Sequence, residues 1–200
     1  MGWMRDETGL EKNDANYVPL TPLSFLTRAA TIWPDHPAVV YGTHRKTYAE
    51  YIQRVTRLAS GLSKLGVQPG DVVATILPNI PAQAEAHFGV PACGAVLNAI
   101  NTRLDVDTIA YILDHGEAKV VLCDPQFLPV LAEAIEQMAT APPQIIEVAD
   151  DHAGVHAHGH YIEYEALLAS GDDTFQWIMP RDEWESLSLN YTSGTTGRPK

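Results

Sequence analysis

The sequence predicts an α/β domain with a layered α-β-α architecture, in which helices cover both faces of a parallel sheet. Short apolar runs alternate with longer amphipathic runs along most of the chain, which is the pattern of successive βαβ units. The apolar run at 72–77 is continuous rather than alternating, as in a strand that is buried on both faces. Glycine, proline and aspartate separate the runs and mark the turns between them.

The first expected elements are a helix, a short strand and a second helix. The first helix is predicted over 22–33, because Thr21 followed by proline is a helix start signal. The apolar run at 38–41 predicts a strand. The second helix, over 47–65, opens with the run Thr47-Tyr-Ala-Glu50, which has the spacing of a capping box. In that motif the threonine hydroxyl caps a first-turn amide while the glutamate reaches back.

Strands and helices alternate regularly after the second helix. The run at 72–77 is continuous and rich in β-branched residues, as expected for a central strand. Asp105 is a candidate N-cap for a later helix, and Gly116 is expected to stop that helix. In chain order we expect a strand at 72–77, a helix at 81–93, a strand at 95–100, a helix at 105–115, a strand at 119–123, a helix at 128–139, a strand at 144–148 and a short strand within 185–190.

Charge and hydropathy argue against several classes of function. The chain has 13 lysines and arginines against 25 aspartates and glutamates, a formal net charge of −12, which opposes a nucleic-acid partner. The longest apolar stretch, 88–100, contains Pro91 and Gly94 and is too short to span a bilayer. The polar N-terminus does not resemble a signal peptide, so we expect a cytoplasmic protein. Cys93 and Cys123 lie in apolar surroundings and are expected to be buried, reduced thiols.

A histidine-rich segment, 150–160, has two possible interpretations. Four of its residues are histidines, which are common metal ligands. Its glycines and aspartates are typical of a solvated surface loop, and no cysteine or Glu-x-x-His partner accompanies the histidines. We therefore expect a surface loop, with at most weak, adventitious binding of nickel or zinc.

The run Tyr191-Thr-Ser-Gly-Thr-Thr-Gly-Arg-Pro-Lys200 has the composition of a phosphate-binding loop. Gly194 and Gly197 allow close approach of the backbone to a ligand, with several N–H groups pointing one way. The hydroxyl residues can donate to phosphate oxygens or join a magnesium shell, and Arg198 and Lys200 add positive charge. A flexible linker would have a similar composition, but a linker seldom follows an apolar strand and ends in Arg-Pro-Lys.

Two other motifs, one for nucleotide binding and one for hydrolysis, are excluded because the residues of this run do not have the required spacing. A Walker A loop needs glycine at 192 and lysine after Gly197, where this chain has Thr192 and Arg198. A Gly-x-Ser-x-Gly nucleophile elbow around Ser193 needs glycine at 191 and 195, where this chain has Tyr191 and Thr195. A polyphosphate cradle of another kind is the remaining interpretation.

This run resembles the signature loop of the adenylate-forming superfamily, which includes acyl-CoA synthetases, peptide-synthetase adenylation domains and luciferases. Similar stretches occur upstream, at 69–71, at 77–79 and at 94–103, the last of which contains Asn98 and Asn101-Thr-Arg103. The opening, 16–25, resembles the branch that uses short- and medium-chain acids and includes methylthio-propanoate ligases. The similarity covers nearly all 200 residues.

The resemblance implies that residues 1–200 are the N-terminal part of the large adenylating domain, an incomplete α-β-α unit. It implies an ATP-dependent acid–CoA ligase with Mg²⁺, in which a carboxylate and ATP form acyl-AMP and pyrophosphate before CoA displaces AMP. The expected substrate is a short- or medium-chain fatty acid or a 3-(methylthio)propanoate-like acid, and the expected assembly is a homodimer. By the same resemblance the phosphates contact Thr192, Ser193, Gly194, Thr195, Thr196, Gly197 and Lys200, with Lys200 catalytic and Thr192 contacting the metal.

Two alternatives stay open at this point. The acyl group could pass to a carrier protein instead of CoA, or the chain could be a non-catalytic α/β dimerisation module. The family's hinge, its ribose-binding aspartate and its C-terminal catalytic lysine have no counterparts within these 200 residues. We therefore expect residues 1–200 alone to be inactive.

Overall fold

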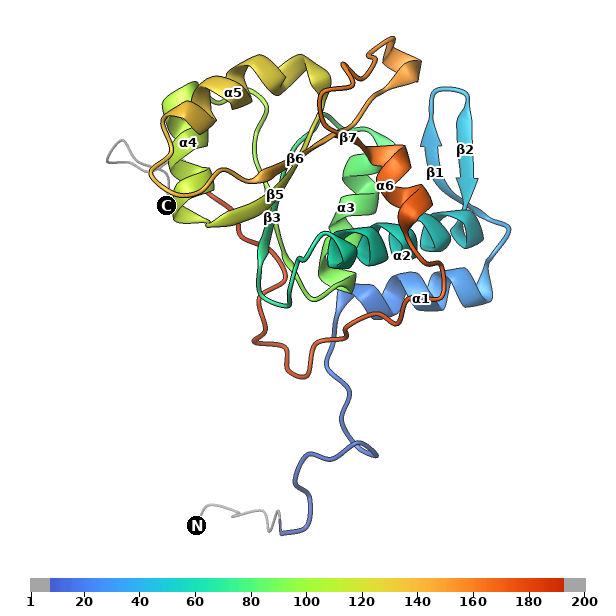
Figure 1. Ribbon diagram of the computed structural model, residues 1–200. Coiled ribbons are helices and arrows are strands. Elements are labelled where there is room, and N and C mark those ends of the chain that lie inside the picture. Colours follow the sequence, from blue (N-terminus) through green and yellow to red (C-terminus); the bar gives the residue numbers. More distant parts are fainter. Residues whose placement is uncertain (1–7, 193–200) are drawn as a thin grey trace.

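The computed structural model describes residues 8–192 of the 200-residue chain (Figure 1). A five-stranded sheet forms the centre, and all of its paired strands are parallel. Its strand order is β4-β3-β5-β6-β7. The strands are β3 (Val72–Ile76), β4 (Val96–Ala99), β5 (Ala118–Cys123), β6 (Gln144–Glu147) and β7 (Ile162–Glu163).

The strand order contains one reversal of direction. The chain passes from β3 to β4 at one edge of the sheet and then returns past β3 to β5, β6 and β7. A topological switch point therefore lies between β3 and β5. In open α/β sheets, ligands bind beyond the carboxyl ends of the strands near such a point.

Helices cover both faces of the sheet, so the predicted α-β-α layering is confirmed (Figure 1). Alternate residues of the strands point to opposite faces: Val73 belongs to one buried cluster, and Ala74 and Ile76 belong to the other. The first face is covered by α2 (Tyr48–Lys64), α3 (Pro81–Ala92) and α6 (Tyr164–Ser170), and the second by α4 (Val106–His115) and α5 (Leu128–Glu136). Helix α1 (Pro22–Ile32) packs beside α2.

The predicted helix starts are confirmed by their capping hydrogen bonds. Thr21 caps α1 with a proline at the first position, and Asp105 accepts from the Thr108 amide at the start of α4. Thr47 and Glu50 form both hydrogen bonds of the capping box of α2. These contacts are local, which explains why sequence spacing was sufficient to predict them.

Five short elements were not predicted, and one predicted strand is wrong. The unpredicted elements are β2 (His44–Thr47), which forms an antiparallel hairpin with β1 (Pro37–Tyr41), the short β7 and α6, and the 3-10 helices η1 (Pro125–Phe127) and η2 (Asp151–Ala153). Within 185–190 the chain forms only an isolated parallel bridge between Ser188 and Leu97, not a strand. The alternating leucines had the period of a strand, but the segment bonds to β4 through a single residue of that strand.

The two cysteines are buried free thiols, as predicted. Burial raises the pKa of Cys93 to about 11 and that of Cys123 to about 12, so both stay protonated at neutral pH. Within the described part of the chain, no helix is both long and apolar enough to cross a bilayer.

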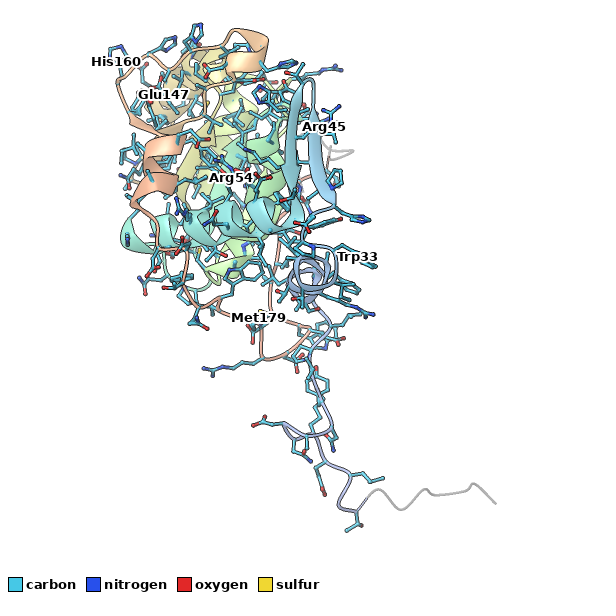
Figure 2. The ribbon with its side chains drawn as sticks, turned by 90° about the vertical axis from the view of Figure 1, so that its right-hand side faces the viewer. Trp33, Arg45, Arg54, Glu147, His160 and Met179 are labelled. Atoms are coloured by element: carbon cyan, nitrogen blue, oxygen red, sulfur yellow. The ribbon has the colours of Figure 1, made fainter. Side chains whose placement is uncertain are left out.

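The histidine-rich segment is a surface loop, as predicted. All four of its histidines are exposed, and Figure 2 shows His160 at the outer rim. The fully buried Glu147 accepts hydrogen bonds from the backbone amides of His158 (3.0 Å) and Gly159 (3.1 Å). The buried carboxylate of Glu147 thus holds the backbone of the loop in place. In residues 8–192, no group of three or more histidine, cysteine or carboxylate side chains is arranged to hold a metal ion.

An ion-pair network that includes the buried carboxylate of Glu85 joins three helices of the first face. Arg54 of α2 pairs with Glu85 of α3 at 2.5 Å and with Glu165 of α6 at 2.6 Å. The Tyr164 hydroxyl donates to Glu85, whose side chain is fully buried. Hydrogen bonds from Arg54 hold the pKa of Glu165 below its usual range. The Arg54 side chain, labelled in Figure 2, is partly exposed at 22% and bridges the three helices.

Close packing of α2 against α6 depends on a glycine. A Cβ atom at Gly171 would lie 2.2 Å from the backbone carbonyl oxygen of Arg57, which cannot easily move. We expect Gly171→Ala to lower the free energy of unfolding by about 1–3 kcal/mol, the usual cost of overpacking. Urea denaturation measures this change. The neighbouring Ser170→Ala is the control, expected within about 0.5 kcal/mol of wild type; equal values for both variants would contradict the prediction.

Candidate phosphate-binding site

The segment that leads into the glycine-rich loop lies against the edge strand β4. The Leu97 amide donates to the Leu187 carbonyl at 3.1 Å, and the Leu189 amide donates to the Leu97 carbonyl at 2.8 Å. This bridge is parallel to β4, so the chain runs on toward the carboxyl ends of the strands. The loop thus begins on the side of the sheet where ligands bind in α/β proteins.

The end of α4 leaves room for this segment. A Cβ atom at Gly116 would lie 3.2 Å from the Leu189 side chain and 3.4 Å from Nδ2 of Asn98. Asn98 is buried in β4, and its Nδ2 has no hydrogen-bond partner within the described residues. A glycine at 116 therefore lets the loop segment, the edge strand and the end of α4 meet at one place.

Tyr191, the first residue of the loop, is held by two side chains of α4. Its hydroxyl is hydrogen-bonded to Nδ1 of His115 at 2.7 Å. Its ring makes edge contacts with His115, with centroids 5.7 Å apart, and with Tyr111, with centroids 6.4 Å apart. Tyr111 and His115 stack on each other at 5.4 Å with an interplanar angle of 26°. Burial raises the pKa of Tyr191, so its phenol is protonated at neutral pH.

Of the predicted phosphate-contacting residues, only Thr192 lies within the described part of the chain. It is exposed, directly after the anchored Tyr191. Ser193, Gly194, Thr195, Thr196, Gly197 and Lys200 lie outside the described residues, so their predicted roles stay predictions. The structure establishes where the loop begins and how its first residue is held.

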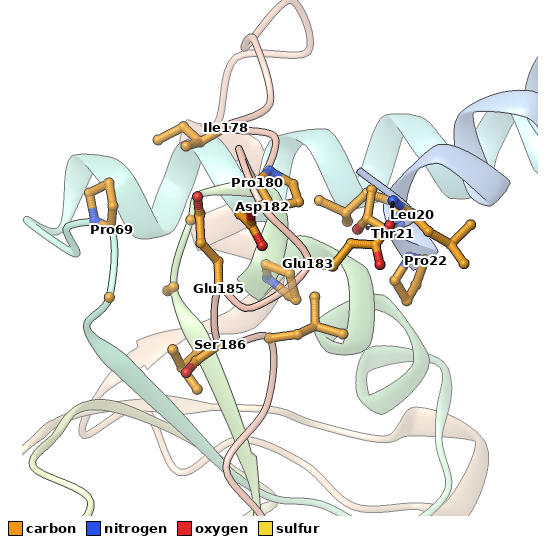
Figure 3. A pocket seen from close by; sticks show the side chains of 17 residues that line it. Leu20, Thr21, Pro22, Pro69, Ile178, Pro180, Asp182, Glu183, Glu185 and Ser186 are labelled. Atoms are coloured by element: carbon orange, nitrogen blue, oxygen red, sulfur yellow. Dashed lines mark hydrogen bonds between the residues drawn. The ribbon is translucent and has the colours of Figure 1, made fainter. Parts of the chain in front are cut away.

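A separate cavity of about 590 Å³ lies at the opposite, amino end of β4 (Figure 3). It is lined by Gly94, Val96 and the carboxylates Asp182, Glu183 and Glu185, among others. Each of these carboxylates already accepts a backbone amide: Asp182 from Trp184, Glu183 from Leu20 and Glu185 from Arg181. This cavity is distinct from the loop and has no part in the predicted phosphate site.

Comparison with protein families decides the assignment of the chain. Residues 26–200 match the family model described as AMP-binding enzyme. This chain belongs to the AMP-binding enzyme family. The match includes β4, α4 and the whole glycine-rich run, so the superfamily predicted from the loop is confirmed.

Curated members of the AMP-binding family with similar sequences are CoA ligases. The chain is 42% identical over 207 residues to the peroxisomal acetate/butyrate–CoA ligase AAE7 of Arabidopsis thaliana, covering 98% of this chain and 36% of the relative. It is also 42% identical to the acetate–CoA ligase CCL3 of Humulus lupulus, with the same coverage. The chain thus spans about a third of the length of the relatives that it matches.

The fold also matches that of solved CoA ligases. The anthranilate CoA ligase AuaEII, crystallised with anthranoyl-AMP, superposes with a TM-score of 0.83 at 22% identity, covering 95% of this chain and 35% of that one. At this identity the likeness shows the fold alone. The described residues therefore have the fold of the N-terminal domain of AMP-binding CoA ligases.

The relatives overturn the prediction of a cytoplasmic protein. AAE7 and three further relatives, among them a trans-cinnamate:CoA ligase of Petunia hybrida at 40% identity, are peroxisomal by name. The prediction was wrong because it relied on a polar N-terminus. A peroxisomal address of the Ser-Lys-Leu type is read at the C-terminus of a protein, so the N-terminal segment does not bear on it.

Sequence reasoning missed two residues of this site, Tyr111 and His115. They lie in a helix that was predicted at 105–115 from its N-cap and its glycine stop, but the contact of His115 with Tyr191 spans 76 residues of sequence. No spacing rule connects residues so far apart. The tertiary structure brings the end of α4 close to Asn98 of β4 and to Leu189, and with it these two side chains to Tyr191.

Proposed function

We propose that the protein is an ATP-dependent acid–CoA ligase and that the loop 191–200 binds the pyrophosphate half of ATP. The carrying observation is the family match through the whole loop, together with the anchoring of Tyr191 beside the carboxyl end of β4. The chain is acidic, with a net charge of −12, yet two basic residues, Arg198 and Lys200, lie two positions apart in this loop. Such a pair suits a polyphosphate.

The proposed reaction has two steps. A carboxylate oxygen attacks the α-phosphorus of ATP, the bond to the bridging oxygen breaks, and pyrophosphate leaves with its electron pair. The CoA sulfur, as a thiolate, then attacks the acyl carbon, and AMP leaves. Both steps bring anions together, so backbone amides and cations aimed at the phosphates lower the barrier. Lys200 and the amides around Gly194 and Gly197 are the groups of this chain proposed for that role.

A magnesium ion would fit the predicted phosphate-binding loop only when it is bound together with the nucleotide. Mg²⁺ keeps several waters and is held mostly by phosphate oxygens with one or two protein groups. Thr192 offers one hydroxyl at the start of the loop, and no cluster of three candidate ligands exists among residues 8–192. When bound with ATP, the ion would neutralise phosphate charge, and Thr192 would contribute at most one oxygen to its shell.

The proposed substrate is a short- or medium-chain aliphatic acid. Relatives with 40–42% identity carry acetate, butyrate or 2-methylpropanoate in their names, which supports a small acyl group. A 3-(methylthio)propanoate-like acid has a comparable size. One methylene changes selectivity by about 1–3 kcal/mol, so closely related acids are expected to compete.

Pyrophosphate release by the full-length protein tests this proposal. With ATP, Mg²⁺ and a panel of acids from acetate to octanoate, we expect acid-dependent pyrophosphate release, and acyl-CoA and AMP once CoA is added. Thioester formation only with a carrier protein would replace the ligase proposal with the carrier alternative. No acid-dependent pyrophosphate release with any member of the panel would favour a non-catalytic dimerisation module.

Two further points belong to the same proposal. Residues 1–200 alone are expected to form no acyl-CoA, because the ribose-binding and C-terminal groups of the family have no counterparts in them. A homodimer is proposed for the complete protein. Light scattering during size-exclusion chromatography measures its mass, and a monomer at working concentration would contradict the dimer.

A further inference from the structure

We propose that Tyr111 and His115 of α4 are positioning residues for the phosphate-binding loop, acting through Tyr191. This inference rests on the proposed function, because it names residues that set the position of the same site. Neither side chain belongs to the glycine-rich run itself. Both reach Tyr191 because the C-terminal end of α4 lies near β4, where a Cβ atom at Gly116 would be 3.4 Å from Nδ2 of Asn98.

The geometry favours a built anchor over a chance contact. Three rings contact one another pairwise: Tyr111 stacks on His115, and the ring of Tyr191 meets both edge-on at 79° and 80°. The hydrogen bond between Tyr191 Oη and His115 Nδ1, at 2.7 Å, adds a directional restraint. Aromatic rings have few rotatable bonds, so such contacts restrict the position of Tyr191 at a low cost in side-chain entropy.

The contacts of Tyr191 with α4 fix the chain directly before Thr192, the first of the predicted phosphate-contacting residues. The bridge to Leu97 holds Ser188 and Leu189, and the contacts to α4 then hold Tyr191, so the chain is restrained on both sides of Asn190. Thr192 follows immediately. We therefore expect the position of the predicted phosphate donors to depend on this fixed residue before them. Misplacing catalytic groups by about 1 Å costs up to roughly 100-fold in rate.

A double-mutant cycle in the full-length protein tests the anchor. His115→Phe keeps a ring against Tyr111 but removes the hydrogen bond, and Tyr191→Phe removes the hydroxyl. We expect each single variant to raise KM for ATP by about 3- to 10-fold and to lower kcat, with KM for the acid nearly unchanged. The double variant should be no worse than the poorer single variant, because both substitutions remove one shared contact.

Two matched variants separate positioning from general damage. His115→Asn places a hydrogen-bonding atom near the position of Nδ1 and should restore at least half of the lost ATP affinity. His36→Phe makes the same chemical change at an exposed histidine before β1, away from α4, and should leave KM unchanged. Fully additive losses in the double variant, or equal losses in His36→Phe, would overturn the proposal.

Hydrogen exchange supplies a readout that does not need activity. The Leu189 amide is bonded to the Leu97 carbonyl, so its exchange reports on the segment before Tyr191. We expect about 10-fold faster exchange at 187–192 in His115→Phe, with exchange in α2 unchanged. Unaltered exchange would overturn the anchor. If the wild type releases no pyrophosphate yet this exchange difference appears, the proposed function fails while the anchor stands.

Discussion

Lys200→Ala in the full-length protein is expected to lower kcat/KM for acid-dependent pyrophosphate release by about 100-fold or more. The loop carries two cations, and Lys200 is the one predicted to contact the β- and γ-phosphates of ATP. Removing one charge-stabilising donor from a transition state usually costs about 100- to 1,000-fold in rate. Steady-state kinetics with a coupled pyrophosphate assay measure the effect, with ATP and acid varied separately.

The control for this variant is a lysine of equal charge outside the loop. Lys119→Ala removes the exposed lysine of β5 and should leave kcat/KM within about two-fold of wild type. A loss in Lys119→Ala similar to that in Lys200→Ala would mean that overall charge, and not a local contact, governs ATP binding. Unchanged kinetics in Lys200→Ala would contradict the predicted role of the loop.

Arg54→Ala is expected to lower the free energy of unfolding by about 3–5 kcal/mol, the largest stability effect of a single truncation that we predict. The guanidinium group forms two hydrogen bonds with Glu85, from Nε at 2.5 Å and from Nη2 at 3.1 Å, and two more with Glu165. Its removal would leave the carboxylate of Glu85 fully buried without its counter-ion, with Tyr164 as its remaining donor. Urea denaturation followed by far-UV circular dichroism measures the loss.

Arg57→Ala is the matched control on the same helix. Its partner is Asp173, and both side chains are about two-fifths exposed, at 39% and 41%. An ion pair in such a position contributes roughly 0–1 kcal/mol. A similar loss in the free energy of unfolding in both variants would show that the α2–α3–α6 network stabilises the fold no more than an exposed ion pair does. The double variant Arg54→Leu/Glu85→Leu should recover part of the loss, because no buried charge is then left unpaired.

The predictions that succeeded from sequence depended on neighbours along the chain. Thr47 and Glu50 lie three residues apart, so their spacing alone predicted the capping box that starts α2. The continuous run at 72–77 predicted the buried strand β3, because a strand that is covered on both faces has mostly apolar residues. The segment β2, with the sequence HRKT, was missed because it forms a hairpin at the surface and carries no apolar period.

The sequence by itself determined the layered α/β class, the helix starts and the family signature in the loop 191–200, since each of these depends on residues that are close in the chain. Only the tertiary structure decided the strand order, the burial of Glu85 against Arg54 and the anchoring of Tyr191 by Tyr111 and His115. The physical reason is that these contacts form when helices pack on a sheet. Which residues contact one another then depends on how the layers pack, and it cannot be predicted from the spacing of residues in the sequence.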